Sequence, residues 1–332
     1  MSAVGQVAGR VAEHFGIELT DVRAVETGAD RGADLFRGTD VAGTDFAVKW
    51  SANDSAAGLV IPGGLAVVAP GTVADVVRTR DGRLWTEVAG RRLSVTRWVT
   101  GTPALQGPLR REQWTAYGRL LARLHRLPVD DDLRAAVPAE TYDPSRWVRA
   151  FDAADHAVTG VGRGADEIQE RLADGWAAGR GKLVEVRDRA VRLAAELRRR
   201  TDLPAPVPCH ADPHLGNVIA TGDQSVVLID FDDAVLAPPE RDLMFVLGGG
   251  VLPFAPATAV QQGWFLDGYG AVEPDADLLA YYRCTRALED VTDLALVALD
   301  PTLDPPERAE NLGYVEGVLG PYGLPAQALR DG

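Results

Sequence analysis

The most constraining feature of this sequence is the stretch of residues 209–233, in which two polar clusters flank a short apolar run. The first cluster ends at Asn217 and the second begins at Asp230, while the run at 226–229 predicts a buried strand. A Gly-Asp turn before that run makes residues 217–220 the other strand of a hairpin. Such a hairpin brings Asn217 and Asp230 together at its open end, where their oxygen atoms suit Mg²⁺.

Asp212 lies five residues before Asn217, on the loop that leads into this hairpin. A base Asp, then a metal-binding Asn, then a second metal-binding Asp after a hairpin is the order found in a kinase catalytic loop. The pattern H-x-D-x-x-x-x-N followed by I-D-F-D resembles the aminoglycoside phosphotransferases and related small-molecule kinases. Downstream, A-P-P-E-R-D-L-M-F, G-G-G-V and L-L-A-Y-Y-R resemble the members of that family that act on spectinomycin.

The resemblance implies a role for each polar residue of the stretch. Asp212 would accept the proton of a substrate hydroxyl, while Asn217 and Asp230 would hold Mg²⁺ on the phosphates of ATP or GTP. Supporting positions around the loop are expected for His210, His214, Asp232 and Asp242. Of these, Asp242 would brace the catalytic loop, and Asp232 would either support the loop or contribute to the Mg²⁺ site.

A second part of the nucleotide site is expected upstream, at F-A-V-K-W over residues 46–50. This strand resembles the V-A-I-K strand whose lysine holds the α- and β-phosphates. Lys49 is one of only two lysines among 34 basic residues, which favours a specific use of its compact ammonium group. A kinase pairs this lysine with a Glu on the following helix, but residues 51–70 contain none. Either Asp54, the only acid there, substitutes, or phosphates alone hold Lys49.

The nucleotide is expected to meet two further segments. Gly28 and Gly32 lie where a kinase covers the phosphates, and glycines would let backbone amides approach them. Because G-x-G-x-x-G is absent, a plain hairpin turn is the alternative. Residues 97–101 would form the hinge that contacts the adenine, with Trp98 and Val99 as candidate contacts. A core position is the alternative for Trp98.

Aromatic and acidic side chains in the second half of the chain are candidates for contact with a cationic substrate. They are Tyr142, Asp143, Trp147, Glu289 and Asp290. Helix packing with solvated acids is the alternative for the first three. Acids at 289, 290 and 293 fall at helical spacings that repel one another, which favours a cationic neighbour. That neighbour would be either Arg286 or an ammonium group of the substrate.

The order of elements, with the resemblance, predicts an α+β, bilobal, protein-kinase-like fold. A small β-rich N-terminal lobe at 1–100 would bind the nucleotide, and a larger, mostly helical lobe at 101–332 would carry catalysis and substrate binding. The main helices are expected at 111–127 and 278–296, with one or two helices over 165–200.

Composition restricts the class of protein further. A net charge of −14 argues against a nucleic-acid partner, and it suits either solubility or the attraction of a polycationic substrate. Two cysteines without metal spacing favour a reducing cytoplasm. We find no basic and apolar leader and no apolar stretch long enough for a membrane span. Monomer and dimer are both compatible with the sequence.

The predicted function is transfer of the γ-phosphate of ATP or GTP to a hydroxyl of an aminocyclitol or aminoglycoside antibiotic, with a spectinomycin-like substrate favoured and resistance as the result. One alternative is a kinase of a metabolite such as choline, homoserine or a sugar. Another is a nucleotide-binding pseudokinase, slightly favoured by the missing Glu after Lys49. H-A-D-P-H also permits a metal hydrolase through His210, Asp212 and His214, but that reading leaves Asn217 and D-F-D unexplained.

Overall fold

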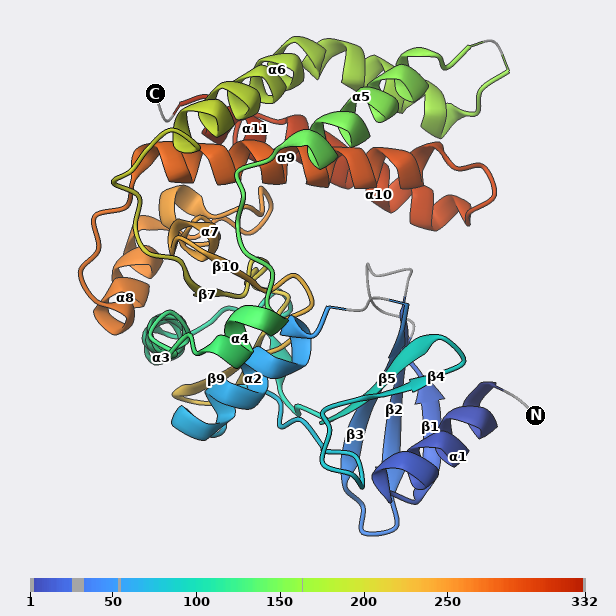
Figure 1. The fold of residues 1–332 in the computed structure, drawn as a ribbon. Helices are drawn as coiled ribbons and strands as arrows, with labels where there is room; N and C mark the ends of the chain where they lie inside the picture. The colour runs from blue at the N-terminus through green and yellow to red at the C-terminus, as the bar shows by residue number, and fades with distance from the viewer. Residues whose placement is uncertain (1–2, 26–32, 53–54, 163, 331–332) are drawn as a thin grey trace. The chain divides into compact units, whose positions relative to one another are not determined.

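The computed structural model describes residues 3–25, 33–52, 55–162 and 164–330 (Figure 1). The chain divides into two compact units that each gather distant parts of the sequence. Unit 1 consists of Met1–Ala139, Val207–Leu236 and Trp264–Gly270, and unit 2 consists of Glu140–Pro206, Ala237–Gly263 and Ala271–Gly332. The predicted catalytic stretch, residues 209–233, therefore belongs to unit 1.

Unit 1 begins with a helix on an antiparallel sheet. In the described part of the chain this sheet has the strand order β1-β2-β3-β5-β4. Its strands are β1 (Leu19–Ala24), β2 (Ala33–Asp40), β3 (Asp45–Ser51), β4 (Thr86–Val88) and β5 (Arg91–Arg97). Helix α1 (Ala3–Phe15) lies against the sheet (Figure 1). Val7, Val11 and Phe15 of α1 recur at helical spacing and share one buried cluster with Phe36 and Val48 of the strands.

The remainder of unit 1 carries the predicted catalytic stretch. Its elements are α2 (Ala57–Val68), β6 (Thr102–Pro103), α3 (Arg111–Leu124), α4 (Asp131–Ala136), β7 (Val207–Cys209), β8 (Val218–Gly222), β9 (Ser225–Leu228) and β10 (Val235–Ala237). A second sheet has the order β6-β8-β9, and β7 pairs with β10. Helix α3 packs on β9, and Gln113 of α3 donates a hydrogen bond to the Gly222 carbonyl at 2.8 Å. The hairpin predicted from the apolar run is thus held from one side by a helix.

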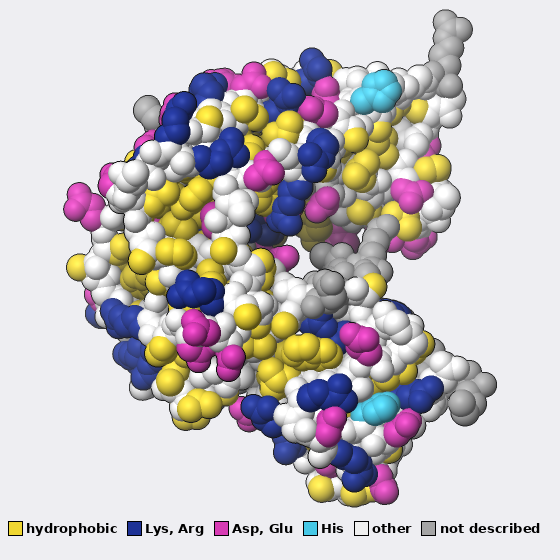
Figure 2. Space-filling view, in the orientation of Figure 1, with side chains coloured by type: hydrophobic (Ala, Val, Ile, Leu, Met, Phe, Trp, Pro, Cys, Tyr) yellow, Lys and Arg dark blue, Asp and Glu magenta, His cyan; other side chains and the backbone are white. Residues whose placement is uncertain are grey.

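Unit 2 is helical. Its elements are α5 (Ser145–Thr159), α6 (Glu167–Leu197), α7 (Glu240–Leu243), η1 (Leu247–Gly249), the first part of α8 (Ala259–Tyr269), α9 (Ala276–Leu299), α10 (Pro305–Leu319) and α11 (Leu324–Ala328). Helix α9 packs against α5, α6, α10 and α11, and its buried side chains form the centre of the apolar core (Figure 1). Basic and acidic side chains are interspersed over the outer face of α5 and α6 (Figure 2). No helix in the described residues combines the length and the apolar character needed to cross a membrane.

The predicted α+β class is confirmed, with antiparallel sheets in unit 1 and helices in unit 2. The helical pattern at 165–200 forms the single long helix α6, and the patterns at 111–127 and 278–296 form α3 and α9. The predicted boundary near residue 100 follows the end of β5 at Arg97, and the division into two lobes at that point stays a prediction. The compact units divide elsewhere, because unit 1 continues to Ala139 and takes in the hairpin that follows β7.

Candidate active site

The catalytic loop, which we define as residues 210–217, leads from the end of β7 into the hairpin of β8 and β9. The two strands pair in antiparallel register, and the Ile229 amide donates to the Asn217 carbonyl at 3.0 Å just beyond them. Asn217 and Asp230 therefore lie at the same end of the hairpin, as the sequence predicted. A rigid hairpin thus sets the separation of the two predicted metal ligands.

Asp212, the predicted base, is held by two neighbours within the loop. The Asn217 side-chain amide donates to the Asp212 carbonyl at 2.9 Å and lies 3.3 Å from Oδ2 of the same residue. His214 Nε2 is 3.5 Å from that Oδ2. Because His214 Nδ1 accepts a hydrogen bond from the Gly216 amide at 2.9 Å, Nε2 carries the hydrogen of the neutral ring. Both neighbours therefore approach the Asp212 carboxylate with donors.

His210 links the catalytic loop to the segment after β9. Its Nδ1 accepts from the Asp212 amide at 3.2 Å, so its Nε2 donates to the Ile229 carbonyl at 2.9 Å. The ring is fully buried and lies 4.3 Å from the Phe231 ring, centroid to centroid. The histidine is thus bonded at both nitrogens, which leaves it a loop-holding position rather than one in the chemistry.

Two non-glycine residues of the site have a left-handed backbone. The φ angle of Ala211 is 69° and that of Asp230 is 64°. This region is costly for residues with a Cβ atom, and residues held there concentrate at functional sites. The surrounding hydrogen bonds and ring contact keep these conformations in place, so that Asp212 and Asp230 each lie next to, or on, a sharply turned peptide.

Lys49 on β3 contacts the two outer acids of the D-F-D pattern. Its Nζ is 2.6 Å from Asp232 Oδ2 and 3.3 Å from Asp230 Oδ1. The predicted lysine and the predicted metal ligand are therefore neighbours in unit 1. Asp232 as a partner of Lys49 was missed by the sequence analysis. The signal was present in the sequence: an acid two residues after the metal ligand, in a chain that lacks the helix Glu.

The other predicted nucleotide contacts are only partly described. Gly28, Gly32 and the alternative Lys49 partner Asp54 lie outside the described residues. Trp98 and Val99 follow β5, in the segment that joins the larger sheet to β6, and both are half-buried. The indole of Trp98 has the Arg37 guanidinium over it, 4.9 Å from the ring centroid. Adenine contact by Trp98 and Val99 stays a prediction.

The predicted substrate residues at the start of α5 lie in unit 2. Asp143 accepts hydrogen bonds from the side chain and the amide of Ser145, which hold the pKa of its carboxyl below the ordinary value. Tyr142 packs edge-on against Tyr281 of α9. Burial, with the charge of Glu140, raises the pKa of Tyr142 to about 12, so this phenol stays protonated at neutral pH. Asp143 is therefore exposed and bonded to Ser145, a neighbour within the same segment.

Trp147 and the acids of α9 form a small group in unit 2. The Arg146 guanidinium lies over the Trp147 ring at 4.2 Å and also bonds to Glu289 at 3.3 Å. Asp290 accepts a bond from Arg286 at 2.6 Å, so the arginine named as its structural partner takes that place. The structure thus joins Trp147 and Glu289 through one arginine.

Two further acids of α5 have structural partners. Asp155 accepts bonds from Arg180 at 2.8 Å and from the Trp176 indole at 2.9 Å, and these bonds lower the pKa of its carboxyl. Asp152 pairs with Arg187 at 2.9 Å. All three partners belong to α6, so these acids join two helices of unit 2.

Asp242 lies in α7 of unit 2 and is completely buried. Its neighbour Glu240 is also buried and accepts a hydrogen bond from the Asp275 amide at 3.0 Å, ahead of α9. The bracing of the catalytic loop by Asp242 stays a prediction.

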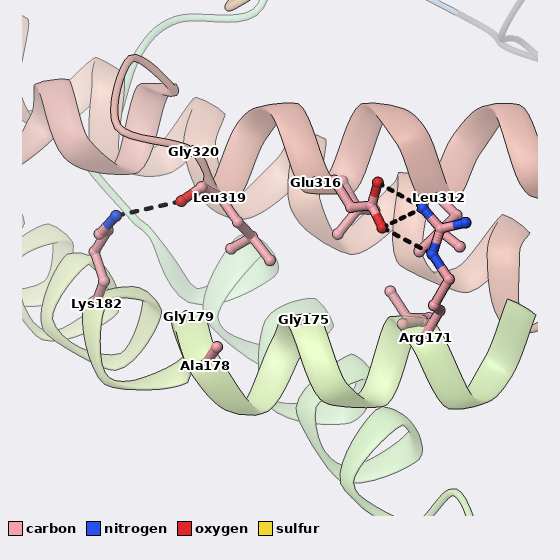
Figure 3. A pocket seen from close by; sticks show the side chains of 11 residues that line it. Arg171, Gly175, Ala178, Gly179, Lys182, Leu312, Glu316, Leu319 and Gly320 are labelled. Atoms are coloured by element: carbon pink, nitrogen blue, oxygen red, sulfur yellow. Dashed lines mark hydrogen bonds and ion pairs between the residues drawn. The ribbon is translucent and has the colours of Figure 1, made fainter.

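A groove of about 280 Å³ runs between α6 and α10 of unit 2 (Figure 3). Arg171 and Glu316 form a paired ion contact on its wall, and Lys182 donates to the Leu319 carbonyl at 3.3 Å (Figure 3). None of the predicted site residues lines this groove. The charged groups on its wall are bonded to each other or to a helix end, as in a packing seam.

The oxygen atoms that the hairpin offers as metal ligands suit a hard divalent cation. The Asn217 amide nitrogen is used on Asp212, so its carbonyl oxygen is the atom suited to a metal. Asp230 adds a carboxylate that is half exposed. One neutral oxygen and one anionic oxygen from a fixed hairpin suit Mg²⁺, which keeps several of its waters and takes few protein ligands.

Comparison with known proteins identifies a family model and two curated relatives. A phosphotransferase enzyme family model matches residues 65–275, which include the whole catalytic stretch. Protein StrN of Streptomyces griseus is 30% identical over 169 residues, 49% of this chain and 50% of that protein. An N-acetylmuramate/N-acetylglucosamine kinase of Caulobacter vibrioides is 33% identical over 117 residues, 33% of this chain and 31% of that enzyme. The chain thus matches half of one curated relative and a third of the other.

The fold has a full-length counterpart among solved structures. The crystal structure of spectinomycin phosphotransferase APH(9)-Ia, in complex with ADP and spectinomycin, superimposes with a TM-score of 0.83 at 22% identity. The match covers 98% of each chain, so the two proteins share a kinase-like fold over almost their entire length. From the family model and the catalytic stretch it covers, this chain belongs to the phosphotransferase enzyme family.

Proposed function

We propose that this protein transfers the γ-phosphoryl group of ATP or GTP to a hydroxyl group of an aminocyclitol antibiotic, with spectinomycin as the first candidate. The observation that carries the proposal is the grouping of Lys49, Asp212, Asn217 and Asp230 in one unit. Lys49 and Asp230 are 3.3 Å apart, and Asn217 bonds to Asp212. A phosphate-binding cation, two metal ligands and a carboxylate base are the parts that phosphoryl transfer requires.

Each residue of this group has one task in the proposed reaction. Asp212 accepts the proton of the substrate hydroxyl and orients its oxygen toward the γ-phosphorus. Lys49 neutralises charge on the nucleotide phosphates. Asn217 and Asp230 hold Mg²⁺, which supplies charge neutralisation across the phosphates when bound. His210 and His214 keep the loop and the Asp212 carboxylate in place through the bonds described above.

The choice of spectinomycin rests on the resemblance downstream of the loop and on the similarity to the spectinomycin phosphotransferase structure. The acids of unit 2 suit an amine-bearing substrate. We propose Glu289 as the ion-pair partner of that amine, because the 3.3 Å bond from exposed Arg146 is long enough to be exchanged. Phosphorylation would add a bulky dianion to the drug and disrupt its contacts with its target, which would confer resistance in the cytoplasm.

A second candidate is the same reaction on an amino sugar. The region of similarity to an N-acetylmuramate/N-acetylglucosamine kinase favours it. The pseudokinase alternative was favoured because no Glu after Lys49 could pair with the lysine. It loses that support, since Asp232 provides a carboxylate 2.6 Å from Lys49 Nζ.

The experiment is a measurement of Mg²⁺-dependent nucleotide consumption with ATP and GTP in parallel. The acceptors are spectinomycin, several aminoglycosides, N-acetylglucosamine, choline and homoserine. Turnover with spectinomycin supports the proposal as stated. Turnover with a different acceptor and not with spectinomycin would support the proposed reaction but assign another substrate. Nucleotide binding without turnover on any acceptor contradicts the proposal.

A further inference from the structure

The lysine that holds nucleotide phosphates needs a carboxylate to orient it, and kinases place that carboxylate on the helix after the lysine strand. Here that helix is α2, whose sequence A-G-L-V-I-P-G-G-L-A-V-V contains no acid. Within the described residues, the Lys49 ammonium bonds instead to Asp232 Oδ2, at 2.6 Å. We infer that Asp232 is the positioning residue for Lys49 and takes over the part of the helix carboxylate.

The packing of α2 is shaped around the Asp232 side chain. Gly58, in the first turn of α2, faces Asp232 so closely that a Cβ atom at position 58 would lie 2.6 Å from Asp232 Oδ1. The same atom would be 3.3 Å from the Asp232 Cα. Any side chain at this position would therefore displace the carboxylate. A glycine here leaves room for an acid that arrives from a different part of the chain.

The partial positive charge at the N-terminal end of α2 gives a second reason for a carboxylate beside it. The helix has no acid in its first turn, and its N-cap residue, Ala56, makes no side-chain hydrogen bond. The N-terminal end of a helix carries a partial positive charge, which a nearby carboxylate stabilises. Asp232 thus lies between two positive groups, with Oδ1 toward Gly58 of the helix end and Oδ2 on the Lys49 ammonium.

The two aspartates in contact with Lys49 differ in a way that separates their tasks. Asp232 is 2.6 Å from the ammonium and its side chain is 32% exposed, whereas Asp230 is 3.3 Å away and 51% exposed. An ammonium has three hydrogens, so it can keep one carboxylate and still reach phosphate oxygens. Asp232 would keep its bond to Lys49 in the nucleotide complex, while the more exposed Asp230, with its longer contact, would be available to hold Mg²⁺.

The first arm of the test is kinetic and rests on the proposed function. Asp232→Asn lowers kcat at least ~10-fold with a small change in the KM of the acceptor. The reason is that Lys49 loses the charge-assisted bond that orients its ammonium group toward the phosphates. Asp232→Glu restores part of the rate. In a Lys49→Met background, Asp232→Asn costs less than ~2-fold more, since the two residues act as a unit. Additive losses with a shifted Mg²⁺ dependence would make Asp232 a metal ligand and overturn the inference.

The second arm uses two glycines of the same helix. Gly58→Ala removes no charge but pushes the Asp232 carboxylate away, so its rate falls in the same direction as that of Asp232→Asn. Gly63→Ala is the matched control, because a Cβ atom there meets nothing within 4 Å. Equal rates for the two alanine variants would contradict the packing argument.

The third arm needs neither nucleotide nor acceptor, so it stays decisive if the proposed function fails. Lys49 and Lys182 are the only lysines of the chain, and an amine-reactive reagent followed by peptide mass spectrometry reports on both. Asp232→Asn speeds labelling of Lys49 at least ~3-fold relative to Lys182, because the charge-assisted bond that holds the amine at 2.6 Å is lost. Asp54→Asn is the comparison variant and should change the ratio less than ~2-fold, because the bond from Lys49 to Asp232 remains. The reverse pattern, or no change in either variant, assigns Lys49 to another partner and overturns the inference.

Discussion

Asp212 and Asp230 both belong to the candidate active site, but their surroundings suit different chemistry. Asp212 receives donors from Asn217 and His214 at its carboxylate, which orient it within the loop. Asp230 has a left-handed backbone, with φ at 64°, and its half-exposed carboxylate faces Lys49. The first arrangement suits a fixed base, and the second suits a ligand that binds a cation from solution. Two substitutions separate these tasks.

Replacing the base should remove chemistry and keep binding. Asp212→Asn retains the size of the side chain and the backbone oxygen that Asn217 bonds. We expect turnover to fall at least ~100-fold, which is the contribution of a positioned base. Isothermal titration should give a nucleotide affinity close to that of the wild type. Turnover near the wild-type rate would remove Asp212 from the base role.

Replacing the metal ligand should weaken binding itself. Asp230→Asn is preferred to alanine, because Asn tolerates the left-handed backbone that this position requires. We expect at least a ~10-fold loss of Mg²⁺-nucleotide affinity, the effect of losing a charge-assisted contact, without a large change in melting temperature. Calorimetric titration of nucleotide at several Mg²⁺ concentrations measures it. Unchanged affinity at every concentration would place the metal site elsewhere.

At the element scale, α3 and the unit 1 part of α8 approach so closely that glycine is required on both sides. A Cβ atom at Gly118 would lie 2.0 Å from the Phe265 carbonyl, and one at Gly268 would lie 1.9 Å from the Thr115 carbonyl. Both distances are far below van der Waals contact, so backbone would have to move. Because α3 also packs on the catalytic hairpin, this seam supports the site indirectly.

The seam can be tested with two glycines of α8. Gly268→Ala should lower the free energy of unfolding by about 2–3 kcal/mol, the usual cost of forcing extra atoms into a packed contact. Gly263→Ala is the control, since its Cβ atom would meet nothing within 4 Å, and it should raise stability by up to about 1 kcal/mol through helix propensity. Chemical denaturation measures both, and similar values for the two variants would refute the close approach.

The contact of α5 with α6 gives a prediction about pH. The bond from Arg180, with that from Trp176, lowers the pKa of Asp155, whose side chain is only 15% exposed. A lowered folded-state pKa gives stability that is present above the unfolded pKa of about 3.9 and is lost as the pH falls through the folded value. Asp155→Asn should therefore cost about 1–2 kcal/mol at neutral pH.

The same variant should cost progressively less as the pH falls below about 4, because the wild-type carboxyl is then protonated as well. Asp152→Asn is the matched control, since its side chain is 49% exposed, and it should cost no more than about 0.5 kcal/mol. Urea unfolding across pH measures the difference between each variant and the wild type. A pH-independent cost for Asp155→Asn would show that its charge does not stabilise the fold.

For the molecule as a whole, the two compact units separate the predicted tasks. All described residues assigned to nucleotide, metal and base lie in unit 1, and all residues assigned to the substrate lie in unit 2. This division was not visible in the sequence, where the boundary was drawn at residue 100. Residues 207–236 belong to unit 1, although the preceding residues 140–206 belong to unit 2. No local sequence pattern indicates this change of unit.

Hydrogen exchange followed by mass spectrometry tests this division of tasks. We expect Mg²⁺-nucleotide to protect β3 and the catalytic loop in unit 1, since bound ligand opposes local opening. Spectinomycin should protect the start of α5 and the middle of α9 in unit 2. Nucleotide alone is the control for the ternary mixture. Protection by spectinomycin confined to unit 1 would remove the substrate role from the acids of α9.

The sequence predicted those parts of the site in which residue spacing has chemical meaning. The spacing of Asp212 and Asn217, and the hairpin before Asp230, followed from the pattern alone. The partner of Lys49 was missed: the sequence contains the acid at 232 and lacks a Glu after Lys49, but it does not show that residues 49 and 232 lie close together. Burial and long-range pairing decide such contacts, and neither is written in a local pattern.

The charged residues of the helices show the same limit. The spacing of the acids near Glu289 predicted a cationic neighbour, but not whether Arg286 or a substrate supplies it, and the structure pairs Arg286 with Asp290. Asp152 and Asp155 of α5 likewise pair with arginines of another helix, α6. Pairing across helices depends on which faces meet, and that is a property of the assembled core.

The central claim is phosphoryl transfer to an aminocyclitol with Asp212 as the base, and product analysis tests it most directly. Spectinomycin, ATP and Mg²⁺ are incubated with the wild type or with Asp212→Asn, and the antibiotic is examined by mass spectrometry and phosphorus NMR. We predict that the wild type yields spectinomycin carrying one phosphate ester and that Asp212→Asn yields almost none in the same time. Unmodified spectinomycin from an enzyme that binds Mg²⁺-ATP would contradict the account, as would equal product from both proteins.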